Sequence, residues 1–144
     1  MKSYTVLAFD YGEKFIGVAV GSTQSGLAQA LTTVNATKKG PDWAEITGLI
    51  AEWEPDWLVV GLPLNMDGTE SELTRAARRF GDRLKGRYNL PVHMVDERLT
   101  TIAAKAMLTD AGRSGKRQHK PDIDKLAAQA ILQSFLEDRS RSLP

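Results

Sequence analysis

The chain has 144 residues, of which 42% are hydrophobic and 26% are charged, and these proportions exclude a disordered, collagen-like or disulfide-scaffold protein. A chain of this length buries roughly 70% of its unfolded surface, so we expect one domain over residues 1–144 with a single core. Its 19 basic and 18 acidic residues leave a formal net charge of +1. Taken as a total, that charge argues against a nucleic-acid partner, because phosphate-binding domains usually carry a basic excess.

The sequence contains no cysteine, which excludes disulfides, thiolate nucleophiles and cysteine-ligated metal centres. The first apolar run, Val6–Phe9, ends at Asp10 and is too short for a signal-peptide core or a membrane span. We therefore expect a soluble, cytoplasmic protein.

Apolar runs predict two strands near the N-terminus, at residues 4–9 and 15–20, joined by a turn. A weaker pattern predicts a third strand over residues 27–34. Gly17 lies inside the second strand and Gly21 closes it, which marks places where another backbone or a ligand approaches closely.

Asp42 followed by Glu45 predicts a helix N-cap, and the helix should end at Glu54-Pro55. A short apolar strand at residues 57–60 then runs into a loop rich in glycine and proline. Thr69 with Glu72 has the spacing of a capping box and predicts the start of the next helix. That helix carries a basic set of side chains: Arg75, Arg78, Arg79, Arg83 and Lys85.

Residues 91–95 predict another strand, and Thr100 is expected to cap a helix that ends before Gly112. Residues 112–121 are interpreted as a mobile basic loop, and the last helix is expected to follow with Asp122 as its N-cap. Strands first, then alternating strands and helices, imply an α/β fold in which helices flank a mixed sheet on both faces.

Three carboxylates fall where a layered α/β fold places its site. Asp10 ends the first strand, Glu97 ends the last one, and Asp124 lies in the first turn of the final helix. Ligands collect at the carboxyl ends of strands in open α/β sheets, so Asp10 and Glu97 should face one crevice. Asp124 joins them only if its helix packs close to the sheet, which the small residues Ala127 and Ala128 permit.

Converging carboxylates repel one another, and a hard divalent cation with oxygen ligands is the simplest compensation. Mg²⁺ or Mn²⁺ is the natural candidate, since Mg²⁺ keeps several waters and accepts phosphate oxygens from a substrate. Two such ions about 4 Å apart would activate a water and stabilise the leaving oxygen of an in-line displacement. The pattern therefore points to phosphodiester chemistry.

Each acid taken alone also has an ordinary structural explanation. Asp10 fits a turn residue, Asp124 fits a helix-dipole partner, and Glu97 fits a surface partner of Arg98. Asp96 competes with Glu97, and because adjacent strand residues face opposite sides, only one of the two should enter the site.

Four segments together resemble the YqgF family, also called RuvX. The resemblance covers residues 4 to 138 and rests on Phe9-Asp10-Tyr11-Gly12 with residues 16–20, then residues 60–68, 96–101 and 123–128. A lone Asp-x-Gly is weak, but four motifs in this order are specific.

The resemblance implies an RNase H-like fold with a five-stranded mixed sheet. It also implies a nuclease that processes the 5′ end of precursor 16S rRNA during ribosome biogenesis, with Asp10, Glu97 and Asp124 as catalytic and metal-binding acids and Mg²⁺ or Mn²⁺ as cofactor. An older family label, Holliday junction resolvase, rests on similarity to RuvC. Phe15 departs from the family, since many members have a second basic residue after the one matching Lys14.

Basic residues near the acids are expected to hold substrate phosphates. This nucleic-acid-binding set comprises Lys14, Arg98, Arg113, Lys116, Arg117 and Lys120. The arginines of residues 75–83 fit a solvated helix face equally well.

The leading hypothesis is a nuclease for precursor 16S rRNA, free or within ribosomal particles, working as a monomer or weak dimer without a membrane partner. One alternative is a DNA endonuclease acting on branched DNA, which requires a dimer. A second alternative is a non-catalytic nucleic-acid-binding factor for ribosome assembly.

The net charge of +1 conceals an asymmetry between the two halves of the chain. Residues 1–73 hold 4 basic and 10 acidic groups, whereas residues 74–144 hold 15 basic and 8 acidic groups. The net charge is thus −6 for the first half and +7 for the second. The second half is basic enough to bind phosphates, so the total charge of +1 does not exclude a nuclease.

Overall fold

One mixed sheet of six strands organises the computed structural model, which describes residues 3–99 and 120–142. The elements in chain order are β1 (Thr5–Asp10), β2 (Phe15–Ser22), β3 (Leu27–Thr37), β4 (Gly40–Pro41), α1 (Trp43–Trp53), β5 (Trp57–Leu62), α2 (Glu72–Tyr88), β6 (Val92–Asp96), the 3₁₀ turn η1 (Glu97–Leu99) and α4 (Lys120–Ser142).

The strands follow the order β4-β3-β2-β1-β5-β6 across the sheet. β1, β2 and β3 form an antiparallel meander, whereas β5 and β6 run parallel to β1. All five predicted strands are present. The expected count of five was one short, because β4 adds a pairing of only two residues with the end of β3.

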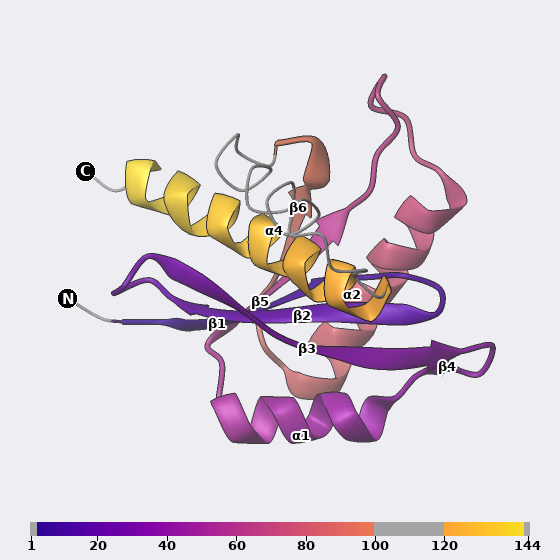
Figure 1. The fold of residues 1–144 in the computed structure, drawn as a ribbon, viewed down its shortest axis with the longest axis horizontal. Coiled ribbons are helices and arrows are strands. Elements are labelled where there is room, and N and C mark those ends of the chain that lie inside the picture. Colours follow the sequence, from indigo (N-terminus) through magenta and orange to yellow (C-terminus); the bar gives the residue numbers. More distant parts are fainter. Residues whose placement is uncertain (1–2, 100–119, 143–144) are drawn as a thin grey trace, which may run out of the picture.

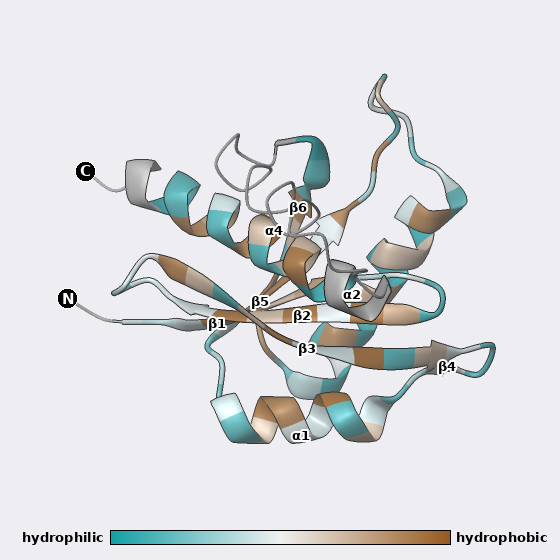
Figure 2. Cartoon of the chain, in the orientation of Figure 1, coloured by the Kyte–Doolittle hydropathy of each residue, from teal (hydrophilic) through white to brown (hydrophobic). Residues whose placement is uncertain are grey.

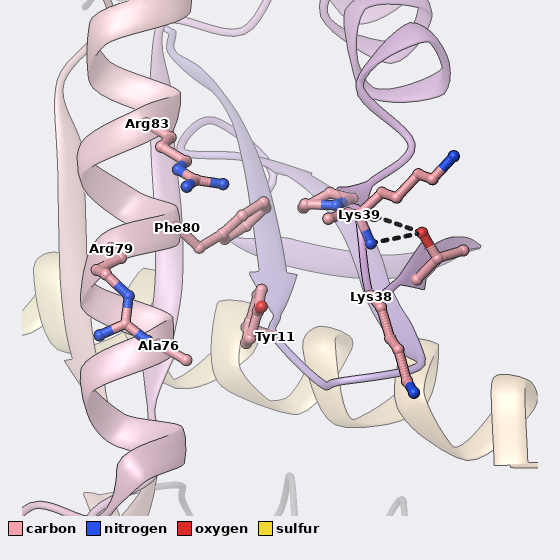
Figure 3. A pocket seen from close by; sticks show the side chains of 10 residues that line it. Tyr11, Lys38, Lys39, Ala76, Arg79, Phe80 and Arg83 are labelled. Carbon is pink, nitrogen blue, oxygen red and sulfur yellow. Dashed lines mark hydrogen bonds between the residues drawn. The ribbon is translucent and has the colours of Figure 1, made fainter.

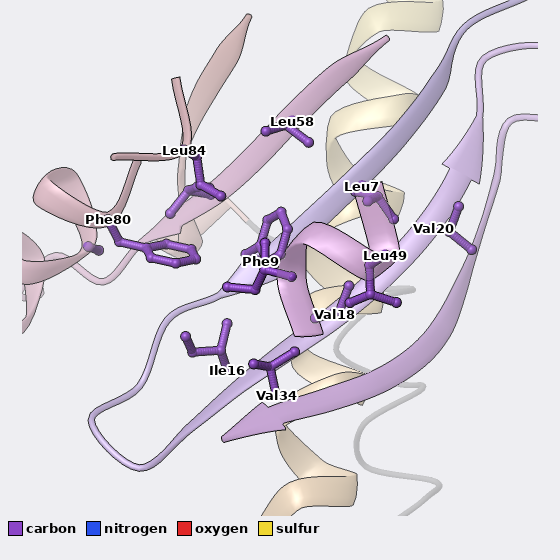
Figure 4. Close-up of a cluster of buried hydrophobic side chains, with 13 residues drawn as sticks. Leu7, Phe9, Ile16, Val18, Val20, Val34, Leu49, Leu58, Phe80 and Leu84 are labelled. Carbon is purple, nitrogen blue, oxygen red and sulfur yellow. The ribbon is translucent and has the colours of Figure 1, made fainter. Parts of the chain in front are cut away.

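Helices cover both faces of the sheet, as predicted (Figure 1). Alternation along β1 divides the core in two: Leu7 and Phe9 pack with residues of α1 and α2, whereas Val6 and Ala8 pack with residues of α4. Figure 2 shows the apolar stripe of α1 turned toward the sheet, and Figure 4 shows the larger cluster closing around Phe9.

Two predicted helix starts were wrong. The N-cap of α2 is Ser71, whose hydroxyl accepts from the Thr74 amide in a capping box. Thr69 is instead held by Asp67, which accepts from both its amide and its hydroxyl. The two motifs overlap in sequence, and the Asp67 turn takes Thr69 out of the helix.

The last helix begins at Lys120, before the predicted N-cap at Asp122. Pro121 is compatible with this start, because proline lacks an amide hydrogen that the first turn of a helix leaves unpaired anyway. The predicted helix at residues 100–110 and residues 112–119 of the predicted loop lie outside the described residues, and the last two residues of that loop, 120–121, belong to α4 instead. Within the described ranges, none of the helices combines the length and the apolar character needed to cross a bilayer.

Candidate active site

Asp10 is the last residue of β1 and lies on the sheet face that α4 covers. The alternation that turns Val6 and Ala8 toward α4 places Asp10 on that same face. Its register partner on β2 is Gly17. The site therefore starts at the carboxyl end of a central strand, where its backbone is fixed by neighbours on both sides.

Glu97 follows β6 directly and bends over the neighbouring strand at Gly61. A Cβ atom at Gly61 would lie 2.6 Å from Glu97 Oε1 and 2.6 Å from Ile131 Cδ1 of α4. Gly61 thus leaves the space that the Glu97 side chain occupies. The sequence predicted that the strand ends at residue 60 and that this glycine begins the following loop, whereas it belongs to β5.

The Asp10 and Glu97 side chains meet over the end of β5, the strand between β1 and β6, and interact through a side-chain hydrogen bond. Burial raises the pKa of Glu97 above its ordinary value, and the charge of Asp96 acts in the same direction, whereas the hydrogen bond with Asp10 opposes the rise. A raised carboxyl pKa at a strand-end cluster is typical of a functional site rather than of a surface pair.

Asp124 lies in the second turn of α4, one turn later than predicted. The backbone of α4 presses on β2 here, since a Cβ at Gly17 would overlap the Asp124 carbonyl oxygen. The Oδ2 atom of Asp124 is inaccessible to solvent. The close helix packing that the prediction required is present. Ala128 is buried against the sheet as expected, and Gly17 on β2 supplies the closest approach.

A divalent cation fits this donor set. Asp10 and Glu97 supply adjacent carboxylate oxygens, and Mg²⁺ commonly binds through one or two carboxylates while keeping its waters. Among the described residues, no group of three His, Cys, Asp or Glu side chains is spaced as a complete metal site. The structure therefore joins Asp10 to Glu97 and brings the backbone of Asp124 against Gly17, opposite Asp10, without forming a three-acid cage.

Arg98 turns away from Glu97 and pairs with Asp96. Its Nη2 lies 2.8 Å from Asp96 Oδ2, and its Nη1 donates to the Met66 carbonyl at 3.2 Å. The hydrogen bond from Arg98 lowers the pKa of Asp96. Arg98 therefore ties the end of β6 to the loop after β5, a link that sequence reasoning missed.

The remaining members of the predicted nucleic-acid-binding set are only partly described. Lys14 is exposed in the turn that follows Asp10. The backbone of Lys120 begins α4. Arg113, Lys116 and Arg117 lie outside the described residues.

Comparisons with known proteins place the chain among nucleases. The family model described as "RuvX: Holliday junction resolvase" matches residues 4–138. A relative from Chromohalobacter salexigens, named "Putative pre-16S rRNA nuclease", is 54% identical over 134 residues, which cover 92% of this chain and 89% of the relative. A relative of the same name from Nitrosococcus oceani is 52% identical over 139 residues, covering 96% and 90%.

Two solved structures of RuvC share the fold. T. thermophilus RuvC in complex with Holliday junction substrate aligns with a TM-score of 0.63 at 17% identity, covering 94% of this chain and 96% of that one. Thermus thermophilus RuvC aligns with a TM-score of 0.55 at 14% identity, covering 95% and 96%. At such identities the likeness establishes the fold alone, which is RNase H-like as expected.

Proposed function

This chain belongs to the RuvX family, and on that premise we propose that it is a metal-dependent nuclease that hydrolyses phosphodiester bonds at the 5′ end of precursor 16S rRNA, acting in the cytoplasm. The family and the names of the relatives support the reaction class and the substrate. The observation that carries the proposal is the hydrogen-bonded pair of Asp10 and Glu97 at the carboxyl ends of β1 and β6.

In the proposed site, Asp10 and Glu97 hold Mg²⁺ or Mn²⁺, and Asp124 completes the ligand set from α4. When bound, the cation supplies an activated water and offsets the negative charge of the phosphate oxygens. Asp10 is the central ligand, because it contacts Glu97 on one side and faces Gly17, beneath the Asp124 turn, on the other.

Other features of the chain position the acidic side chains and favour a cation beside them. Gly17 and Gly61 let α4 and the Glu97 side chain approach the sheet without a Cβ in the way. The raised pKa of Glu97 shows that its ionised form is poorly solvated, so a cation that neutralises this charge would be favoured there. The two glycines and the burial of Glu97 thus favour the binding of a cation by Asp10 and Glu97.

The deciding experiment is cleavage of precursor 16S rRNA, free and in ribosomal particles, by the wild type and Asp10→Asn in the presence of Mg²⁺. The wild type should cut near the mature 5′ end, and the variant should lose at least about a hundredfold in rate while keeping the melting temperature that the wild type has in EDTA. Undiminished cleavage by a folded Asp10→Asn protein would exclude the mechanism.

The family description favours a second candidate, cleavage of four-way DNA junctions. Such a resolvase must present two active sites to two strands and so must be a dimer. Light scattering combined with parallel cleavage assays on precursor rRNA and on a four-way junction separates the two. A monomer that cuts only RNA would exclude the resolvase, and binding without cleavage of either substrate would favour an assembly factor.

A further inference from the structure

A basic pocket lies on the opposite side of the sheet from the acid pair, and none of the proposed catalytic residues lines it. Its volume is about 270 Å³, many times the roughly 10–15 Å³ that a cavity needs to hold one water molecule. One wall is α2, and the other is the turn between β3 and β4 (Figure 3).

Each wall contributes two cations. Arg79 and Arg83 lie four residues apart on α2 and therefore share one face of the helix. Lys38 and Lys39 form the two-residue turn between the paired residues Thr37 and Gly40. None of the described residues that line the pocket is acidic.

None of these four cations forms an ion pair with a described carboxylate. Within residues 3–99 and 120–142, the ion pairs of the structure join Arg78 to Glu70 and Arg98 to Asp96, and neither involves a residue of the pocket. The Lys38 and Lys39 side chains leave the turn in opposite directions, away from the aromatic rings (Figure 3). The cations thus flank the pocket over a wider surface, which suits an extended polyanion that crosses it.

Aromatic side chains lie between the two walls. Phe80 is 2% exposed and forms the floor, and Tyr11 packs on it with ring centroids 5.1 Å apart. Figure 3 shows Tyr11 and Phe80 between the arginines of α2 and the lysine turn. A partly exposed aromatic ring beside cations offers a stacking surface for a base next to phosphate contacts.

Tyr11 also connects this pocket to the acid pair. It packs on the core beneath α1 and α2, whereas Asp10, the preceding residue, contacts Glu97 on the side of α4. Consecutive Cα atoms are only about 3.8 Å apart, so the two sites meet at the end of β1. A single strand could pass around this edge from one site to the other.

We propose that Arg79, Arg83, Lys38 and Lys39 bind the phosphodiester backbone of single-stranded RNA, holding the substrate segment that flanks the scissile bond. The proposal rests on the proposed nuclease function for its choice of RNA over other polyanions. The planar guanidinium groups suit phosphate oxygens, and Tyr11 provides the stacking surface for one base.

The test is the binding of a fluorescently labelled single-stranded RNA, followed by anisotropy in EDTA so that no cleavage occurs. The first variant is Arg79→Gln/Arg83→Gln, and the second is Lys38→Gln/Lys39→Gln on the other wall. The matched control is Arg75→Gln/Lys85→Gln, which removes the same charge from exposed positions of α2 outside the pocket.

Both pocket variants should bind about tenfold more weakly at about 100 mM salt, and each should lower the slope of log affinity against log salt by about 1.4, since two phosphate contacts are lost. The control should stay within about twofold of the wild type. Equal losses in the pocket variants and the control would overturn the proposal, because the effect would then be one of total charge.

Loss in the α2 variant alone would also overturn it, because the binding surface would then be a helix face rather than the pocket. A nucleoside monophosphate serves as competitor and should not displace the RNA at an equal concentration of phosphate groups. Displacement would make the pocket a free-nucleotide site and the RNA assignment wrong. Because RNA binding is measured without cleavage, the binding result can be interpreted even if the protein proves not to be a nuclease.

Discussion

Asp96 and Glu97 are consecutive residues, yet their carboxylates have different partners: Glu97 meets Asp10, whereas Asp96 pairs with Arg98. The alternation of β6 explains the division, because Val95 packs with the α4 cluster and Met94 with the opposite one. The sequence allowed either Asp96 or Glu97 to enter the site. In the structure, Glu97 lies on the side of the sheet that carries Asp10, and Asp96 lies on the other side.

The first prediction compares Glu97→Gln with Asp96→Asn. Glu97→Gln should lower cleavage by at least about a hundredfold, whereas Asp96→Asn should keep most of the rate. Burial raises the folded pKa of Glu97, so its ionised form destabilises the fold at neutral pH, and stability is lost as pH rises through that pKa. Glu97→Gln should therefore be more stable than the wild type at pH 7 when no divalent cation is present.

Thermal melts of the two variants at pH 7 and pH 4 check this prediction. The gain of Glu97→Gln should vanish near pH 4, below the ordinary glutamate pKa of 4.5, where Glu97 itself is protonated. A variant that is less stable than the wild type at both pH values would show that the Glu97 carboxylate supports the fold.

The second prediction concerns the contact of α4 with β2. Gly17→Ala should destabilise the protein by about 3 kcal/mol and should abolish cleavage, because the new methyl group would overlap the backbone of Asp124. Gly48→Ala is the matched control. Gly48 lies on α1, and apart from the backbone of that helix its Cβ would meet no atom within 4 Å, so the substitution should stabilise the protein by about 0.5–1 kcal/mol.

Urea unfolding of the two variants measures both effects on one scale. If Gly17→Ala proved as stable as Gly48→Ala, α4 would not lie against β2 at this point, and Asp124 would lose its place in the site.

Much of the fold was predictable because five of the six strands of the described sheet carry an apolar pattern of their own. The apolar runs of β1 and β5 and the glycine in β2 mark buried strands and a close approach, and the structure confirms both. The errors arose where two local motifs compete, as at Thr69 and Ser71, or where the pairing is too short to leave a pattern, as in β4.

The acid pair was predictable for a different reason: parallel strands end at the same edge of a sheet, so Asp10 and Glu97 had to be near each other. The basic pocket was not predictable. Lys38 and Lys39 belong to the acidic half of the chain, and only the pairing of β3 with β4 brings their turn opposite Arg79 and Arg83.

The third prediction is that Mg²⁺ or Mn²⁺ stabilises the folded protein through Asp10. A ligand that binds only the folded state adds about 1.4 kcal/mol at ten times its Kd, which corresponds to about 5 °C in Tm for a chain of this size. The wild type should show this rise and lose it in EDTA. Asp10→Asn should show none, whereas Asp82→Asn, at an exposed position of α2, should respond like the wild type.

The fourth prediction concerns pH and His93, which lies on β6 far along the strand from the acid pair. Burial lowers the pKa of His93, and the charge of Arg139 lowers it further. The ring packs against Phe135 and Trp57, with centroids 5.4 Å and 5.9 Å apart. A proton on this ring is therefore bound more weakly in the folded state than in the unfolded chain.

The sign follows from proton counting. Between the lowered pKa and the ordinary value of 6.5, the unfolded chain binds more protons at His93 than the folded protein does. The free energy of unfolding is therefore highest above pH 6.5, where His93 is neutral in both states. It decreases as the pH falls from 6.5 to the lowered pKa of the folded state. The wild type should lose more stability between pH 7.5 and pH 5.5 than His93→Phe, which keeps the aromatic packing but cannot titrate.

Arg139→Gln should fall between them, because it removes only the second cause of the lowered His93 pKa. Equal losses in the wild type and His93→Phe, measured by urea unfolding at both pH values, would show that His93 takes up a proton as readily in the fold as in the unfolded chain.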